Sequence, residues 1–207
     1  MKIREFTLTT IFLSVILLCA FTPFGFIHLG VIKATIIHIP IIIGSIILGP
    51  KIGAFLGCVF GITSIVTNTL APTLLSFAFS PAIPVLGTSQ GSLWALCIAI
   101  VPRVIIGFIP YYIFKAVDKT IIKKKSNQKP ALFLTGLLTT FIHTFLVMGS
   151  ISLIFQDAYA QAIQASSTSA IYQAVLTVFF TNGIVEAFLA AFVTATVVPP
   201  LFKLSKK

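Results

Sequence analysis

The sequence GPKIGAFLGCVFG, residues 49–61, decides how the rest of the chain can be arranged. Its glycines recur at every fourth residue of an apolar run, so in a helix they share one face. Pro50 suits the first turn of such a helix, where a missing N–H group loses no partner. Glycine weakens a helix in water by about 1 kcal/mol relative to alanine, but small residues let membrane helices approach closely. The stretch therefore predicts a membrane helix with a bare face, which either packs inside its own bundle or contacts a partner.

The composition of the whole chain agrees with a membrane location. Of 207 residues, 57% are hydrophobic and only 9% are charged, and the mean hydropathy is +1.10. A soluble domain of this size has no means of burying so much apolar surface. Residues 1–207 are therefore predicted to form a single membrane domain in the plasma membrane, with the lipid bilayer as its surroundings.

Apolar segments of crossing length predict six transmembrane helices. Their expected ranges are 6–21, 32–48, 50–70, 92–114, 130–155 and 170–198. Prolines are expected to interrupt the fourth helix at Pro102 and Pro110, and Pro199-Pro200 to end the sixth. The fold class expected from this pattern is an all-α membrane protein.

Basic residues gather at alternate ends of the predicted helices and so indicate the topology. Twelve of the fourteen Lys and Arg residues precede the first helix, follow the sixth, or lie in the second and fourth connections. Because positive charge is retained in the cytoplasm, both termini are predicted to be cytoplasmic. The exceptions are Lys33, at the outer start of the second helix, and Arg103, within the fourth. This distribution argues against nucleic acid as a partner, because nucleic-acid-binding proteins spread their basic residues over one accessible face.

The connection between the third and fourth predicted helices, residues 71–91, is a long extracellular loop without a charge. It carries Phe77, Phe79, Pro81 and Pro84, and so apolar a segment does not extend freely into water. Loops of this length tend to be functional. The segment is expected either to close over an outward-facing pocket or to pack at the membrane interface.

The sequence lacks the motifs of common enzyme classes. It has no Gly-x-x-x-x-Gly-Lys-Ser/Thr phosphate loop, no His-Glu-x-x-His and no Gly-x-Ser-x-Gly. Only one of its four acidic residues, Glu186, lies within a predicted helix, so paired-carboxylate catalysis has no partner. The cysteines lack metal-ligand spacing, and His28 and His38 are interpreted as interfacial or packed. We expect no enzymatic activity, no metal site and no cofactor.

Polar side chains at membrane depth are costly and therefore mark candidate binding residues. Arg103 lies about 16 Å into the fourth predicted helix at 1.5 Å per residue, and His143 and Asn182 lie at a similar depth. Glu186 follows Asn182 by one turn on the same face. Pro102 frees a backbone carbonyl one turn before Arg103. Either Arg103 holds an anionic group while Asn182 and His143 bind hydroxyls or amides, or it pairs with Glu186 and joins two helices.

Four residues near the outer membrane surface are further candidates for substrate binding. Asn68 ends the third predicted helix, where capping, loop contacts and ligand binding are all compatible with its amide. Gln90 and Trp94 lie where the long loop re-enters the membrane, and Trp94 also suits an interfacial anchor. Lys33 either binds a ligand or extends its amine to the interface.

Three segments carry a resemblance to a known family: LGVIKATIIHIP (residues 29–40), LGPKIGAFLG (48–57) and FGITS (60–64). They are similar to the S components of energy-coupling factor (ECF) vitamin transporters, and most closely to the pantothenate-specific branch. The resemblance covers nearly the whole chain. It implies high-affinity capture of a vitamin near the outer leaflet, docking on a transmembrane coupling subunit with two ATPase subunits, and toppling in the bilayer to release the vitamin inside.

The resemblance also implies where the chain docks on its partner. In this family the first three helices form the docking surface, with an Ala-x-x-x-Ala pattern on the first helix. That pattern is absent here, and Thr10-x-x-x-Ser14 is the nearest pair of small residues. The bare face of the third predicted helix is expected to contribute through small residues, namely Gly49, Gly53, Gly57 and Gly61.

The candidate residues suit the ligand of the pantothenate branch. Pantothenate carries one carboxylate, two hydroxyls and an amide, which Arg103 with nearby Asn and His side chains can bind. Riboflavin calls for more aromatic stacking, and folate for more than one cation. Three alternatives stay open: an S component for riboflavin, folate or hydroxymethylpyrimidine, a stand-alone secondary transporter, and a scaffold without a ligand. Secondary transporters usually have internal repeats and intramembrane acids for coupling ions, and here no repeat is found and Glu186 stands alone.

Overall fold

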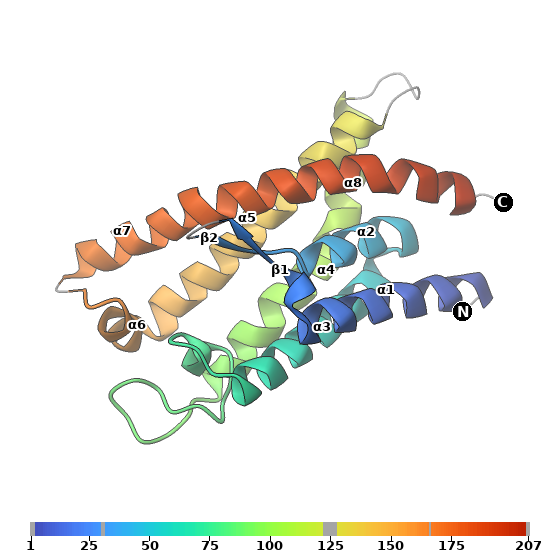
Figure 1. Cartoon of the computed structure of the whole chain (residues 1–207). Coiled ribbons are helices and arrows are strands. Elements are labelled where there is room, and N and C mark those ends of the chain that lie inside the picture. The colour runs from blue at the N-terminus through green and yellow to red at the C-terminus, as the bar shows by residue number, and fades with distance from the viewer. Residues whose placement is uncertain (1–2, 30–31, 122–127, 166, 206–207) are drawn as a thin grey trace.

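The computed structural model describes residues 3–29, 32–121, 128–165 and 167–205, which form a bundle of long helices with one short hairpin (Figure 1). The predicted all-α membrane fold is confirmed in part: the described residues are mainly helical, but they include a two-stranded hairpin, and six crossings are not confirmed. In chain order the elements are α1 (Ile3–Phe21), η1 (Pro23–Gly25), β1 (Phe26–Leu29), β2 (Ile32–Thr35), α2 (His38–Leu48), α3 (Pro50–Leu70), η2 (Ser76–Ala78), α4 (Trp94–Ile121), α5 (Lys129–Ile154), α6 (Gln156–Ala162), α7 (Thr168–Val178), η3 (Phe179–Gly183) and α8 (Ile184–Ser205).

Within these ranges, five segments are long and apolar enough to cross a membrane: α1, α3, α4, α5 and the run from α7 to α8. The predicted range of α3 agrees with the structure at both ends. Figure 1 shows both chain ends at one end of the bundle, and α6 with the connection from α3 to α4 at the other. The start of α1 and the end of α8 therefore lie at the same end of the bundle, while the number of crossings and the cytoplasmic side stay predictions.

The second predicted helix, 32–48, is wrong in its first part. Ile32–Thr35 form strand β2, which pairs antiparallel with β1, and the helix begins only at His38. β-Branched residues at both ends of this strand favour an extended backbone, and a continuous apolar run does not distinguish strand from helix. The remaining helix α2 has 11 residues, about 16 Å, which is too short to cross a bilayer alone.

Prolines do not interrupt or end the helices where the sequence predicted it. Helix α4 continues through Pro102 and Pro110, and α8 continues past Pro199 and Pro200 to Ser205. Membrane helices tolerate proline where neighbouring groups bond the carbonyls that it frees. The freed carbonyl before Pro102 becomes part of the candidate site.

The glycine face of α3 packs inside the bundle against α4. Gly53, Gly57 and Gly61 are buried, and a Cβ at any of them would collide with a backbone carbonyl of α4. On the α4 side, a Cβ at Gly107 would collide with the carbonyl of Gly53. We call this contact the glycine seam. The prediction that Gly53, Gly57 and Gly61 dock on a partner is wrong, because α4 already covers that face.

Gly49 separates α2 from α3 instead of joining the seam. Its φ of +92° is a backbone conformation that side chains disfavour, and its N–H donates to the Ser45 carbonyl at 3.0 Å. Pro50 then begins α3. Thr10 and Ser14 lie exposed on α1, so the docking role of Gly49, Thr10 and Ser14 stays a prediction.

The connection from α3 to α4 is packed against the bundle rather than extended. Its short helix η2 is buried, and Phe77 lies edge-on to Phe155 with ring centroids 5.7 Å apart. The Ser76 hydroxyl donates to Asn68 Oδ1 at 2.7 Å. These contacts fix the connection against α3 and α5, and they bring Phe79 toward the interior.

Candidate functional site

A cavity of about 300 Å³ lies in the half of the bundle away from the termini. Its walls come from all the crossing helices, from Thr35 of β2, and from Phe79 of the connection before α4. Five of the residues predicted to bind a substrate line it: Arg103, Asn182, His143, Asn68 and Glu186. The sequence therefore identified the main polar side chains of this site.

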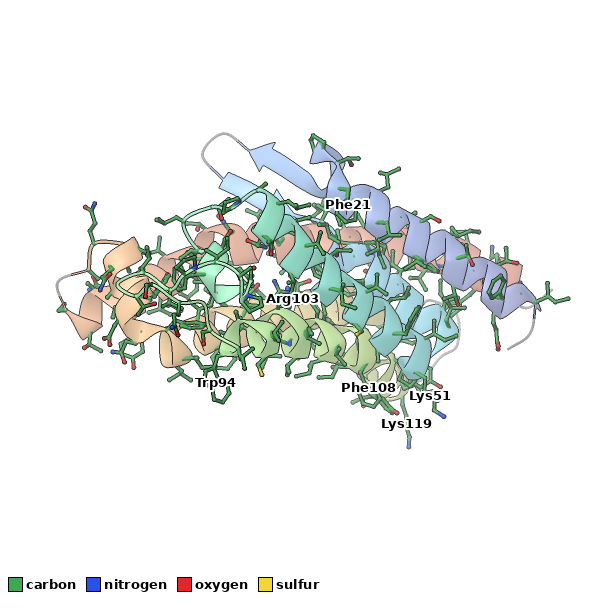
Figure 2. The ribbon with its side chains drawn as sticks, turned by 90° about the horizontal axis from the view of Figure 1, so that it is seen from below. Phe21, Lys51, Trp94, Arg103, Phe108 and Lys119 are labelled. Atoms are coloured by element: carbon green, nitrogen blue, oxygen red, sulfur yellow. The ribbon has the colours of Figure 1, made fainter. Side chains whose placement is uncertain are left out.

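Arg103 reaches the cavity from α4 and is only 7% exposed. Figure 2 shows it inside the bundle, whereas Trp94 and Phe108 of the same helix point outward. Its Nη1 donates to the Ile98 carbonyl at 2.7 Å. Pro102 has no N–H with which to bond that carbonyl. The predicted effect of the proline is confirmed, and one arm of the guanidinium is held by its own helix.

Two aromatic rings flank the Arg103 guanidinium. Its Cζ lies 5.6 Å from the ring centroid of Phe60 on α3 and 4.8 Å from that of Phe79. Such cation–π contacts stabilise a desolvated cation without neutralising it. Arg103 Nε has no hydrogen-bond partner among the described residues. The guanidinium is therefore positioned on three sides and retains donor capacity toward the cavity.

The alternative ion pair between Arg103 and Glu186 is not formed. Both side chains lie in the described part of the chain, and Glu186 Oε1 accepts a hydrogen bond from the Thr35 N–H at 2.6 Å instead. Within the described residues, no carboxylate lies in ion-pair contact with Arg103. A buried cation without an anionic partner is costly, so the cavity suits an anionic ligand group.

Two histidines line the cavity next to Phe60. The rings of His38 on α2 and His143 on α5 lie 6.0 Å apart, and the ring of His143 lies 6.5 Å from that of Phe60. His38 Nε2 and His143 Nδ1 have no hydrogen-bond partner among the described residues. Within that same part of the chain, no three His, Cys, Asp or Glu side chains are grouped to hold a metal ion. Each ring therefore has one buried nitrogen that no described residue satisfies.

Asn182 and Glu186 reach the cavity from the junction between α7 and α8. The π-helical turn η3 includes Asn182 and Gly183, and both line the cavity. Such turns interrupt the regular helical bonding and are frequent at functional sites. As predicted, Asn182 and Glu186 share one face. The hydrogen bond from the Thr35 N–H to Glu186 ties α8 to the end of β2.

Asn68 lines the cavity, but both ends of its amide are already bonded. Nδ2 donates to the Ser64 carbonyl at 2.8 Å, and Oδ1 accepts from Ser76 as described above. Of the three predicted roles, the structure shows loop contact. Asn68 holds the connection that carries Phe79 over the cavity.

Two other candidates, Gln90 and Trp94, do not join this cavity, and a third, Lys33, is not tested. Gln90 lines a separate, shallow groove with residues 85–92 and Phe155. Trp94 is 60% exposed at the start of α4, as expected of an interfacial anchor. The prediction that these two bind the ligand is therefore corrected. Lys33 lies in β2, where its backbone pairs with His28; its side chain lies outside what the structure describes.

The residues of the cavity wall that the sequence reasoning missed include His38, Thr35, Phe60 and Phe79. His38 could have been found, because it is a polar side chain in an apolar run, the property that singled out His143. Phe60 and Phe79 carried no such signal among so many aromatic residues. Thr35 acts through its backbone, which sequence alone does not place.

Comparison with known proteins gives two findings. The family model described as "ECF transporter, substrate-specific component" matches residues 4–198. The chain is also 38% identical, over 172 residues, to the pantothenic acid transporter PanT of Lactococcus lactis subsp. cremoris (strain MG1363). That match covers 83% of this chain and 79% of the relative.

Proposed function

The chain belongs to the family of substrate-specific components of ECF transporters, and from that premise we propose that it captures pantothenate outside the cell for import. Membership makes it a multi-pass plasma-membrane protein of vitamin uptake and not an enzyme. Pantothenate as the vitamin is supported by the relative, whose name assigns it that substrate, and by the chemistry of the cavity.

The observation that carries the proposal is the buried Arg103 guanidinium at the cavity wall. It is the sole Lys or Arg among the described lining residues, and no described carboxylate pairs with it. A ligand with one carboxylate supplies the missing anion and accepts charge-assisted hydrogen bonds. Pantothenate has one carboxylate, which matches the single cation Arg103, whereas folate has two.

The remaining wall suits the rest of the molecule. A volume of about 300 Å³ is at the small end of ligand pockets and favours a short, flexible acid over a fused ring system. His38, His143 and Asn182 offer polar atoms for the amide and hydroxyl groups. Val147, Met148 and Ile37 offer apolar contact for the methyl groups.

Binding of radiolabelled pantothenate to the purified protein tests the proposal. We expect saturable binding that unlabelled pantothenate displaces. The alcohol analogue, in which CH2OH replaces the carboxylate, is expected to compete at least ~30-fold less well, because it lacks the charge-assisted bonds to Arg103, worth about 2 kcal/mol or more. Displacement by riboflavin, folate or hydroxymethylpyrimidine, or no binding of pantothenate, contradicts the proposal.

We further propose that the chain works with a transmembrane coupling subunit and two ATPase subunits, as its family implies. The supporting observation is that the small residues Thr10 and Ser14 lie exposed on α1 together with large exposed apolar side chains, as close helix packing in a membrane requires. Co-expression with the coupling subunit and the ATPases is expected to give a complex that co-purifies. Ser14→Trp is expected to abolish co-purification while pantothenate binding persists; an intact complex contradicts this docking face.

A further inference from the structure

The two rings beside the Arg103 guanidinium are held in place in different ways. Phe60 lies on α3 between Gly57 and Gly61 of the glycine seam, so the packing of α3 against α4 places it. Phe79 directly follows the short helix η2 and lies in a turn. Its ring centroid is the nearer to Arg103 Cζ, at 4.8 Å against 5.6 Å for Phe60. The nearer ring therefore depends on other contacts for its position.

Side-chain hydrogen bonds fix the chain on both sides of Phe79. Before it, the Ser76 hydroxyl donates to Asn68 Oδ1 at 2.7 Å. After it, Ser80 Oγ lies 2.6 Å from Thr69 Oγ1. The single hydrogen of the Thr69 hydroxyl is already donated to a carbonyl of its own helix at 2.7 Å, so Ser80 is the donor in this pair. We call these two bonds, from Ser76 and Ser80 to the end of α3, the serine clamp.

The serine clamp is buried, although one of its partners lies outside the cavity wall. Ser76 and Ser80 are both 0% exposed, so a broken bond leaves a buried hydroxyl without a partner, which is costly. Thr69 is exposed on α3 and is not among the described residues that line the cavity. The bond that connects Thr69 to the cavity wall is the one to Ser80, the neighbour of Phe79.

We propose that Phe79 is a positioning residue: fixed by the serine clamp, its ring holds the Arg103 guanidinium in the orientation that binds the carboxylate of the ligand. The Nη1 bond to the Ile98 carbonyl fixes the guanidinium at one point, and arginine is a long side chain with many rotamers. A ring against the cation restricts it further, so binding loses less side-chain entropy. The inference rests on the proposed function, because it takes a ligand whose carboxylate Arg103 binds.

The ratio of two dissociation constants isolates this role. It is the constant for the alcohol analogue divided by that for pantothenate, both measured calorimetrically, since only pantothenate has the carboxylate. Contacts of Phe79 with the part of the molecule that both compounds share change both constants equally and cancel. The wild-type ratio is expected to be at least ~30, and Phe79→Leu is expected to lower it ~10-fold. Phe79→Tyr, which keeps the ring, is expected to retain the wild-type ratio.

The serine clamp is tested from outside the cavity by Thr69→Val. This substitution keeps the shape of the side chain but removes the hydroxyl that accepts from Ser80. The ratio is expected to fall ~3-fold, because Phe79 loses one of its two anchors. Adding Thr69→Val to Phe79→Leu is expected to lower the ratio no further, because the clamp acts through a ring that is already absent.

Two matched variants control for the loss of a hydroxyl and the loss of a ring. Thr120→Val removes an exposed hydroxyl that bonds the Ala116 carbonyl of its own helix at 2.8 Å. Phe133→Leu removes a ring of α5 that packs against Phe188, with ring centroids 6.3 Å apart. Neither residue is among the described cavity lining, and both variants are expected to keep the wild-type ratio. If Phe79→Leu does not fold, Thr69→Val at its exposed position tests the inference alone.

The outcomes separate this inference from the proposed function. If Phe79→Leu and Thr69→Val weaken the binding of both compounds equally, so that the ratio stays at its wild-type value, the positioning role fails although pantothenate still binds. If the losses from the two substitutions multiply, the clamp does not act through Phe79 and the inference fails. If the wild type binds no pantothenate, or binds the alcohol analogue as tightly, the proposed function fails and this inference with it.

Discussion

The glycine seam and the ligand cavity are built from the same two helices, α3 and α4, yet they treat polar groups in opposite ways. Along the seam, backbone meets backbone and no space is left for a Cβ at Gly53 or Gly57. In the cavity, Arg103 Nε, His38 Nε2 and His143 Nδ1 have no partner among the described residues. The difference teaches that close backbone packing in the seam offsets the cost of leaving polar atoms at the cavity without hydrogen-bond partners.

Arg103 belongs to both regions. Its carbonyl oxygen faces Gly57 across the seam, while its guanidinium lines the cavity. Close packing against Gly57 restricts the backbone of Arg103, whose side chain lines the cavity. Binding then costs less ordering entropy. Substitutions in the two regions should therefore change different quantities, which gives three ways to test the comparison.

The largest effect is expected from Arg103→Met, which removes the cation from the cavity and leaves the seam intact. Affinity for pantothenate is expected to fall by about 2–5 kcal/mol, or ~30-fold or more, because a buried charge-assisted bond is lost. The apparent melting temperature without ligand is expected to stay within a few degrees of the wild-type value, because Arg103 forms no ion pair with a protein carboxylate that the substitution would break. Calorimetric titration and a thermal-shift assay measure both.

The ligand-induced rise in melting temperature serves as the internal control for this variant. Wild-type protein is expected to be stabilised by saturating pantothenate, and Arg103→Met is not. A variant that melts far below the wild type but still binds would assign Arg103 to the scaffold and not to the ligand.

A smaller effect, on stability rather than on recognition, is expected from Gly57→Leu in the seam. A side chain there collides with the Arg103 carbonyl, and overpacking costs about 1–3 kcal/mol. The apparent melting temperature is expected to fall by roughly 2–12 °C for a chain of this size. Gly149→Leu is the matched control, since a Cβ at this glycine of α5 meets nothing within 4 Å. Equal melting temperatures for the two variants would show that the seam is not tightly packed.

The smallest effect is expected from Glu186→Gln, which weakens the hydrogen bond to Thr35 at the cavity wall but keeps a side chain of similar size. The Thr35 N–H can still donate to the amide oxygen, but that bond is weaker by about 1 kcal/mol than one to a carboxylate. We expect pantothenate affinity to fall ~3- to 10-fold and the Thr35 amide to exchange hydrogen faster. The control is Asp157→Asn, which removes an exposed charge on α6. Unchanged exchange at Thr35 would contradict the support role.

Much of the fold followed from the sequence, because apolar length and periodicity dominate in a membrane. The bounds of α3 agreed at both ends, and α1, α4 and α5 agreed in place. The hairpin before α2 was missed because β-branched and helical apolar runs look alike over four residues. The prolines in α4 and α8 misled the prediction, since neighbouring groups decide whether a membrane helix continues.

The site was predictable where burial of a polar group is itself the signal. Arg103, His143, Asn182 and Glu186 were found by that argument, and His38 should have been. The partners of these residues could not be assigned: whether Glu186 meets Arg103 or Thr35 depends on a strand that the sequence did not reveal. The role of the seam glycines was ambiguous because the glycine pattern is the same whether the helix face packs against α4 or against another protein.

The run from Thr168 to Lys203 has a consequence for the surrounding lipid. Its 36 residues extend about 54 Å at 1.5 Å per residue, far more than the roughly 30 Å of a hydrocarbon core. Helix α2, which packs on the same core cluster, extends about half of that core. Because eight of its 11 residues are buried, α2 makes little demand on bilayer thickness, whereas the long run requires either a thick bilayer or a steep tilt. The length of the lipid acyl chains should therefore determine the tilt angle of this long helical run in the membrane.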